Sequence, residues 1–378
     1  MAFEVAGRIS VRFIRLSVGL GVGGLFLYET AGHAFPEAIC KRALGPGGDE
    51  VPAKCIQIYE EMAAKMHLEH PERVSFFVNR GFSGFHAGAT KLPNGAVIGI
   101  PGWYLFETAE DVMNSPINFK ERTIKWESEM GQQIRDSLIP TKENIAFTIG
   151  HEIGHLQMPE YKILRAIMSP AWLYLTYKVA VSTTRFAPAL SMLLDIALKL
   201  CILRLSYLGY RYVKREVNHH EEFNADKMSA STTVAAAQGG VDYMRKRLQL
   251  NSVLRALHGS SGESYYDQYG NELKARSHPK LTERLHRLES IFSEHMKQQV
   301  ATKPGSDLNN GYVTMNHNGG GVPRYIFVDV GGTFPWAYNF LYHSDSKLTD
   351  SRRMSDSLKR HLAKIAFRLA DANTMSPN

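Results

Sequence analysis

The chain has the composition of a folded globular protein with a large core. It contains 378 residues, of which 44% are hydrophobic and 21% are charged. Its formal net charge of +7 suits an anionic membrane surface. Nucleic-acid binding is not expected, because the sequence lacks zinc knuckles, RNA-binding signatures and alternating basic and aromatic residues. The three cysteines, Cys40, Cys55 and Cys201, are too few for a disulfide framework, so free thiols are favoured over a Cys40–Cys55 pair.

Residues 1–35 are predicted to form an N-terminal targeting or membrane-anchor segment. Three arginines precede an uncharged run over 16–28, which is too short to cross a bilayer by itself. The pattern is typical of a signal-peptide core, a signal anchor or an organelle-targeting sequence. The alternative is a buried helix that packs through Gly19 and Gly23.

The next segments predict a small sheet followed by a long helix. Residues 52–70 carry an apolar stripe at helical spacing, and 74–78 has the composition of a strand. A Pro-Asn-Gly turn separates the expected strands 87–90 and 96–100. The helix expected over 144–158 contains the motif on which the functional interpretation rests.

That motif is H-E-x-x-H, formed by His151, Glu152 and His155. Residues four apart share one face of a helix, so the two imidazoles can bind one ion. Zinc favours such ligands, and a catalytic site needs a third protein ligand and an open position. We expect Glu222 to be that ligand and Asp226, one turn later, to orient His151 from outside the ligand shell.

The residues around these motifs favour a catalytic site over a chance pair of histidines. The flanks of the first motif are uncharged, and Gly150 and Gly154 weaken the helix in a way that suggests close approach of another backbone. Three neighbours of Glu222 compete with it as ligands, but only Glu222 is followed four residues later by an acid with an alanine between them. The competing residues are His219, His220 and Glu221.

Together these motifs resemble the gluzincin metallopeptidases, and among them the family that contains HtpX, the CAAX prenyl proteases and the mitochondrial inner-membrane stress protease. The resemblance rests on 151–155 with 222–226, on the strand-turn-strand segment 87–100 and on the S-H-P-K-L-T-E-R-L segment 277–285. It covers roughly 70–292.

The resemblance implies an α+β, mainly α fold. We expect a zincin-type metallopeptidase domain over 36–295, with a small β-sheet edging the zinc helix and a helical hairpin inserted at 162–210. One Zn²⁺ per chain is expected. A protein or peptide substrate would pair with the edge strand beside the zinc helix, which tolerates many side chains.

The hairpin over 162–210 is the second candidate membrane segment. One apolar block, 166–177, contains Pro170, and the other, 186–208, carries three charged residues. Neither provides a clean spanning stretch. Basic flanks favour a hairpin that dips into or lies on a bacterial or mitochondrial inner membrane; the alternative is a soluble insertion that buries its apolar face.

The segment 277–285 provides two further site candidates. The resemblance places it beside the zinc cleft, where an oxyanion needs a donor, and His278 is the candidate. Arg284 is expected to position His278 or to pair with Asp226 or Glu222. The alternative is that His278 only starts a helix over 280–293 and that Arg284 is a surface charge.

The C-terminal part, 296–378, is expected to lie outside the catalytic domain. Its sequence suggests a Gly- and Asn-rich linker over 304–321, a strand over 325–330 and a basic amphipathic helix over 350–371. The helix is suited either to lipid headgroups or to packing on the catalytic domain.

The sequence therefore predicts a membrane-associated, zinc-dependent endopeptidase in which Glu152 is the general base. Two other classes of function remain open. One is a catalytically silent binding or chaperone-like membrane protein on the same fold. The other is a zinc hydrolase that acts on a non-peptide bond.

Overall fold

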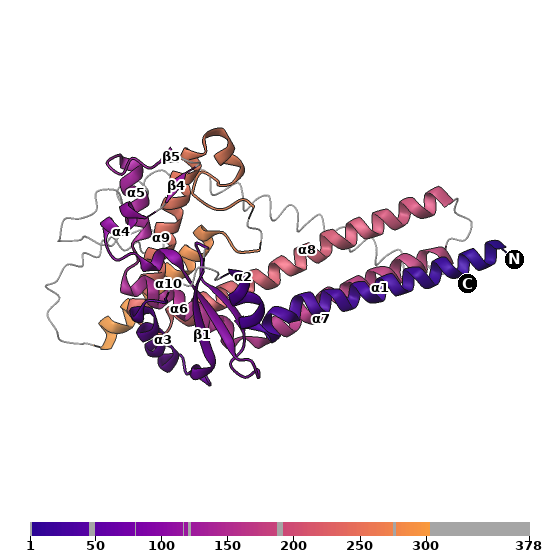
Figure 1. Ribbon diagram of the computed structural model, residues 1–378, viewed down its shortest axis with the longest axis horizontal. Coiled ribbons are helices and arrows are strands. Elements are labelled where there is room, and N and C mark those ends of the chain that lie inside the picture. The colour runs from indigo at the N-terminus through magenta and orange to yellow at the C-terminus, as the bar shows by residue number, and fades with distance from the viewer. Residues whose placement is uncertain are drawn as a thin grey trace, which may run out of the picture. The chain divides into compact units, whose positions relative to one another are not determined.

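The computed structural model describes residues 2–44, 50–79, 81–115, 117–119, 122–186, 192–274 and 277–302. The expected linker, strand and helix of the C-terminal part lie outside these residues. The described chain is mainly helical with a small three-stranded sheet, which confirms the predicted α+β, mainly α fold (Figure 1).

The sheet places one short strand at an edge beside the helix that carries the motif. Its order is β1 (Val74–Asn79), β3 (Ala96–Pro101), β2 (Phe85–Gly88), with β1 parallel and β2 antiparallel to β3. The strand that we expected over 87–90 therefore begins two residues earlier. It ends at Gly88 because the backbone there turns to a φ of 80°, a conformation that side chains other than glycine rarely adopt.

Helix α6 (Lys142–Gln157) is the centre of the fold. Thr141 caps its first turn, and Thr141 and Asn144 exchange hydrogen bonds in a capping box. Helices α3 (Ala53–Lys65), α8 (Met192–Ala230) and α9 (Val234–Leu257) pack around α6. The motif is therefore held in the interior.

Glycines permit these helices to cross closely. A Cβ built on Gly154 would lie 3.1 Å from Cα of Ala225 on α8, and one on Gly239 of α9 would lie 2.1 Å from the carbonyl oxygen of Glu143. Gly154 of the motif helix thus marks a close backbone approach, as the sequence suggested, whereas Gly150 faces the side chains of Ser229 and Met62.

Helix α10 (Leu281–Thr302) packs on α8 and α9 and closes the core. Large side chains that are almost fully buried include Tyr104, Phe147, Ile98 and Met244. The three cysteines are free thiols. The remaining short elements are η1 (Glu37–Lys41), α2 (Arg42–Leu44), η2 (Pro71–Arg73), η3 (Gly102–Leu105), α4 (Ala109–Asn114), β4 (Asn118–Phe119), β5 (Arg122–Thr123), α5 (Glu129–Leu138) and η4 (Gly259–Ser264).

Three long helices form an extension from this core. Helices α1 (Ala2–Ala34) and α7 (Pro159–Phe186) run side by side, and α7 also packs on the N-terminal part of α8 (Figure 1). A polar cluster joins all three: Glu29 of α1 accepts hydrogen bonds from Ser169 of α7 at 2.9 Å and from Lys214 of α8 at 2.6 Å. We call α1, α7 and residues 192–215 of α8 the helical extension.

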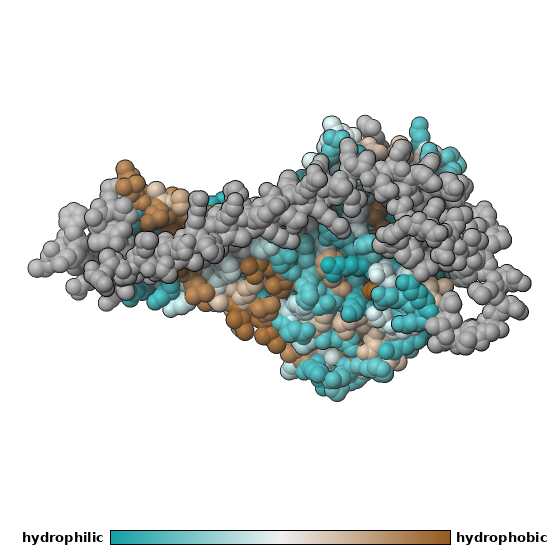
Figure 2. All heavy atoms as spheres, turned by 180° about the vertical axis from the view of Figure 1, so that it is seen from behind, coloured by the Kyte–Doolittle hydropathy of each residue, from teal (hydrophilic) through white to brown (hydrophobic). Residues whose placement is uncertain are grey.

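Large apolar side chains on the helical extension face outward. Leu20 of α1, Leu175 of α7 and Leu193 of α8 are 68%, 60% and 77% exposed. Figure 2 shows brown, hydrophobic side chains gathered towards these helices, whereas much of the core from which they extend is teal. Among the described residues, no helix combines the length and the apolar content needed to cross a membrane.

The close crossing of α6 and α9 predicts a large effect from one methyl group. Gly239→Ala should lower the free energy of unfolding by about 1–3 kcal/mol, because the added Cβ meets backbone that cannot move aside locally. Thermal or denaturant unfolding measures the change.

The matched control is Gly24→Ala on α1, where an added Cβ meets no atom within 4 Å. It should be neutral or stabilise the helix by up to about 1 kcal/mol. Equal melting temperatures for the two variants would contradict the close packing described here.

Candidate metal centre

Three predicted ligands meet in the interior. Nε2 of His151 and Nε2 of His155 lie 3.1 Å apart on one face of α6. The two carboxylate oxygens of Glu222, on α8, lie 3.6 Å from these nitrogens, one from each ring. The three residues are between 2% and 8% exposed. Two helices that are distant in the sequence thus present two imidazoles and one carboxylate to a single point.

The far side of each ring meets a carboxylate. Nδ1 of His151 lies 2.9 Å from Asp226, the orienting partner that the sequence predicted. Nδ1 of His155 forms a hydrogen bond with Glu221 at 3.2 Å. When each Nδ1 carries the proton, each Nε2 carries a lone pair, and the two lone pairs face each other.

This donor set fits a zinc ion. Two lone pairs at 3.1 Å repel unless a proton or cation lies near both. Burial alone would lower the pKa of His155, but the carboxylates of Glu221 and Glu222 raise it to about 9. The site therefore favours positive charge at this point. Two imidazoles and a carboxylate are also a common ligand set of catalytic zinc.

Arg284 of α10 balances the negative charge behind the ligands. Its Nε and Nη2 donate to the two oxygens of Asp226, both at 2.7 Å, and its Nη1 lies 3.0 Å from Glu222. Burial alone would raise the pKa values of these carboxyls, but Arg284 lowers them, that of Glu222 well below its usual range. Arg284 is 9% exposed, so it is not a surface charge.

His278 lies at the rim of the same site. Its Nδ1 is 3.0 Å from Glu222 while its side chain stays 57% exposed, and the hydrogen bond to Glu222 raises the pKa of His278. The structure therefore brings together every site residue that the sequence singled out, although His278 points to a ligand carboxylate and is not held by Arg284.

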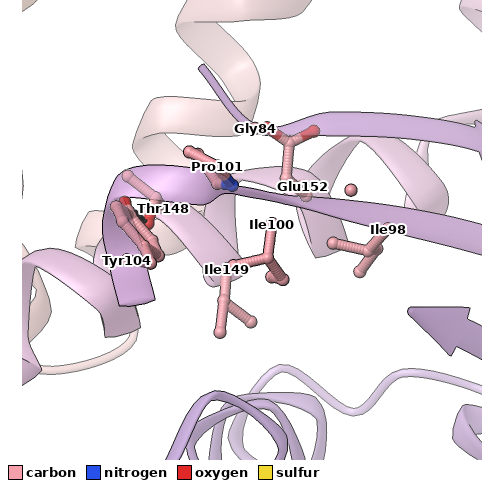
Figure 3. Close-up of a pocket in the computed structure, with 9 residues that line it drawn as sticks. Gly84, Ile98, Ile100, Pro101, Tyr104, Thr148, Ile149 and Glu152 are labelled. Carbon is pink, nitrogen blue, oxygen red and sulfur yellow. Dashed lines mark hydrogen bonds between the residues drawn. The ribbon is translucent and has the colours of Figure 1, made fainter. Parts of the chain in front are cut away.

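Glu152 lies beside a small pocket between β3 and α6 (Figure 3). Apolar side chains such as Ile98, Ile100 and Ile149 line the pocket. Burial there raises the pKa of Glu152, despite the nearby motif histidines. A Cβ on Gly84 would lie 2.3 Å from Oε1 of Glu152, so the carboxylate fits only because the adjacent backbone carries no side chain.

Sequence reasoning missed His86 of the edge strand. Its Nδ1 lies 2.7 Å from Oε2 of Glu152, and its ring stacks on His155 with centroids 4.1 Å apart. Burial holds the pKa of His86 well below its usual range. The signal for His86 in the sequence was its position one residue before the expected strand. That its side chain faces α6 is known only from the structure.

The outer edge of β2 is partly used by the helical extension. The backbone N–H of Gly88 donates to Nδ1 of His33, near the end of α1, at 3.2 Å. The side chain of Asn94 also donates to the carbonyl of Ala34 at 2.8 Å. Helix α1 therefore contacts the strand that was expected to bind substrate.

Comparison with known proteins identifies the family of this chain. The model of peptidase family M48 matches residues 53–292, well over half of the chain. The chain belongs to peptidase family M48, as the resemblance of its motifs predicted.

The curated relatives include transmembrane protein 177 of several vertebrates. The protein from Danio rerio is 28% identical over 281 residues, which cover 70% of this chain and 90% of the relative. The protein from Homo sapiens is 29% identical over 266 residues, which cover 68% of this chain and 85% of the relative. No solved structure gives a significant match.

The position of Arg284 predicts a strong dependence of stability on this side chain. Arg284→Ala leaves Asp226 and Glu222 buried without their cation, so the free energy of unfolding of the zinc-free protein should fall by about 3–5 kcal/mol. Denaturant unfolding in the presence of a chelator measures the change.

Arg245→Ala is the control, since this arginine pairs with Glu289 of α10 at 2.8 Å with both side chains more than 40% exposed. Its loss should cost no more than about 1 kcal/mol. The assignment fails if the two arginine variants unfold at the same denaturant concentration.

Proposed function

We propose that this protein is a zinc-dependent endopeptidase. Membership of peptidase family M48 supports a peptidase. The observation that carries the zinc dependence is the meeting of two Nε2 atoms at 3.1 Å with a carboxylate 3.6 Å from each. His151, His155 and Glu222 would hold the ion. Bound zinc supplies Lewis acidity and lowers the pKa of water towards neutrality.

Glu152 is the general base of this proposal. It follows a ligand on the same helix and accepts the proton of the attacking water on its carboxylate. The apolar surroundings that raise its pKa make that transfer easier. Glu152 then returns the proton to the leaving amine. Contact with His86 at 2.7 Å and with the bare backbone of Gly84 restricts the orientation of the carboxylate.

His278 is the proposed donor to the oxyanion that forms during hydrolysis. It is the imidazole at the exposed rim, and its hydrogen bond to Glu222 directs the ring towards the ligands. A positioned donor of this type stabilises developing charge without reorganisation. Arg284 would act through Glu222 and Asp226, to which it is bound.

Substrate is proposed to pair with the outer edge of β2. This strand lies at the end of the sheet order and contributes His86, which touches Glu152. Strand addition uses backbone hydrogen bonds and therefore accepts many side chains. The contact of His33 with Gly88 would end the paired segment there.

The zinc and base assignments predict separable losses. Wild-type protein should bind about one zinc per chain, and His151→Ala or Glu222→Ala should lose it. Glu152→Gln should keep the zinc and lose at least about 10²–10⁴-fold in peptidase activity, because it removes the base and not a ligand. Metal analysis beside a casein or peptide assay measures both.

Each other outcome has a distinct meaning. An active Glu152→Gln variant would refute the base. Zinc binding without peptidase activity in the wild type would favour a catalytically silent binding protein, or a hydrolase of a non-peptide bond if such a substrate is cleaved.

We also propose that the helical extension associates with a membrane, with a bacterial or mitochondrial inner membrane as the expected location. Its exposed apolar side chains support this. Exposed or half-exposed cations, Lys178, Arg211 and Arg215, lie on the same helices and suit anionic headgroups. The relatives are named transmembrane proteins.

Membrane association is tested by sedimentation with vesicles that contain anionic lipid. The full chain should pellet with the vesicles, resist a salt wash and be released by detergent. Replacing Leu20, Leu175 and Leu193 by serine should move protein to the supernatant, since each is more than half exposed. Phe82→Ser, at an exposed site outside the extension, is the control. A wild-type chain that stays in the supernatant contradicts the proposal.

A further inference from the structure

We propose that Glu221 is a positioning residue that orients His155 for the metal, and that Arg165 of α7 holds Glu221 in place. The inference rests on the proposed zinc site and deepens it. The sequence had treated Glu221 only as a competing ligand.

The contacts of Glu221 are directed away from the metal point. Its Oε1 forms the hydrogen bond with Nδ1 of His155 at 3.2 Å, on the side of the ring opposite Glu222. Its Oε2 accepts from Nη1 of Arg165, and Nη2 of the same arginine lies 3.4 Å from Oε1. The residue is 4% exposed. A buried carboxylate between a cation and a ring N–H has no free oxygen to turn towards an ion.

The arrangement repeats the one around the other motif histidine. Nδ1 of His151 meets Asp226, and Asp226 is held by Arg284 from α10. The two carboxylates flank the ligand Glu222 on α8. Each imidazole therefore has a carboxylate behind it, within 2.9 Å for His151 and 3.2 Å for His155, and each carboxylate is held by an arginine from a further helix. Only with both rings fixed do the two Nε2 atoms converge.

A second metal site made of His86, His155 and Glu221 is the competing interpretation, because their ligand atoms lie within 4.8 Å of one another. Two contacts oppose it. The rings of His86 and His155 stack with centroids 4.1 Å apart at an interplanar angle of 16°, so their nitrogen lone pairs lie in separate, nearly parallel planes and do not meet at one point. Arg165 also neutralises the carboxylate.

Helix α7 thereby becomes part of the metal centre. Lys162, one turn before Arg165, donates from Nζ to the carbonyl of His155 at 2.7 Å and is 8% exposed. Both ends of the His155 residue, its backbone carbonyl and its ring, are thus tied to the first turns of α7. The same helix continues into the helical extension. Metal affinity should therefore depend on the position of α7 relative to α6 and α8.

The test is zinc affinity of the full chain, measured by competition with a chromophoric chelator. Glu221→Gln should weaken zinc binding by about 10–100-fold, as loss of an orienting partner does. It should also change the visible spectrum of the Co²⁺-substituted protein, which reports ligand geometry. Glu221→Asp, which keeps the charge, should recover part of the affinity.

Two further variants sharpen the result. Arg165→Gln should weaken zinc binding on its own, but should add little to Glu221→Gln, because both act through one hydrogen bond. Asp195→Asn is the matched control: Asp195 is an acid on α8 that pairs with Lys199 of its own helix. Its zinc affinity should equal that of the wild type.

Wild-type zinc affinity and an unchanged Co²⁺ spectrum in folded Glu221→Gln would overturn the proposal. If Glu221→Gln does not fold, Arg165→Gln takes its place, and unchanged affinity there has the same meaning. Zinc affinity is read without any peptidase assay. If the wild-type protein binds zinc but cleaves no peptide, and Glu221→Gln binds zinc more weakly than the wild type, this inference is supported while the endopeptidase proposal fails.

Discussion

The close crossing of α6 and α8 is the constraint on which the site depends. A Cβ on Gly154 would approach Cα of Ala225 to 3.1 Å, so the helices meet almost backbone to backbone. At that separation a carboxylate on α8 reaches the imidazoles of α6, and the acids before and after Glu222 reach their far sides. A larger residue at Gly154 would push α8 away from α6 and so separate Glu222 from His151 and His155.

Charge balance is the second requirement. The crossing buries Glu152, Glu221, Glu222 and Asp226 around the two motif histidines, and buried carboxylates are costly unless they are paired. Arg284 balances two of them from α10, and Arg165 balances a third from α7. Glu152 is the exception, since no arginine pairs with it among the described residues: its hydrogen-bond partner is His86, whose pKa is lowered by burial, and the pKa of Glu152 is raised. The unbalanced carboxylate is the one to which we assign proton transfer.

The helical periodicity of the sequence was enough to predict which candidate side chains share a helix face. His151 and His155 are one turn apart, and so are Glu222 and Asp226. Each pair therefore shares a helix face, which can be read from the local sequence alone. The role of Glu221 was not predictable. Adjacent residues on a helix point about 100° apart, and the partners that Glu221 meets lie on other helices. The role of His86 was also hidden, because it arises from a sheet edge that is far from α6 in the sequence.

The candidate membrane segments show a different limit. The sequence indicated a short apolar run over 16–28 and a hairpin over 162–210, because arginines, glycines and a proline interrupt the hydrophobic pattern. The structure instead has helices Ala2–Ala34, Pro159–Phe186 and Met192–Ala230 that continue through these interruptions. Packing between the helices and the polar cluster at Glu29 offset the cost of such residues. One consequence is that α8 carries both apolar surface and the proposed ligand Glu222 without a break.

X-ray absorption at the zinc edge of the purified full chain tests the central claim most directly. The account predicts two imidazole nitrogens at about 2.0–2.1 Å and carboxylate oxygen at about 2.0–2.2 Å, with the imidazole signal reduced in His155→Ala. A chain that retains no zinc after dialysis would contradict the account. So would a zinc shell that contains sulfur at about 2.3 Å, or one that is unchanged in both His155→Ala and Glu222→Ala.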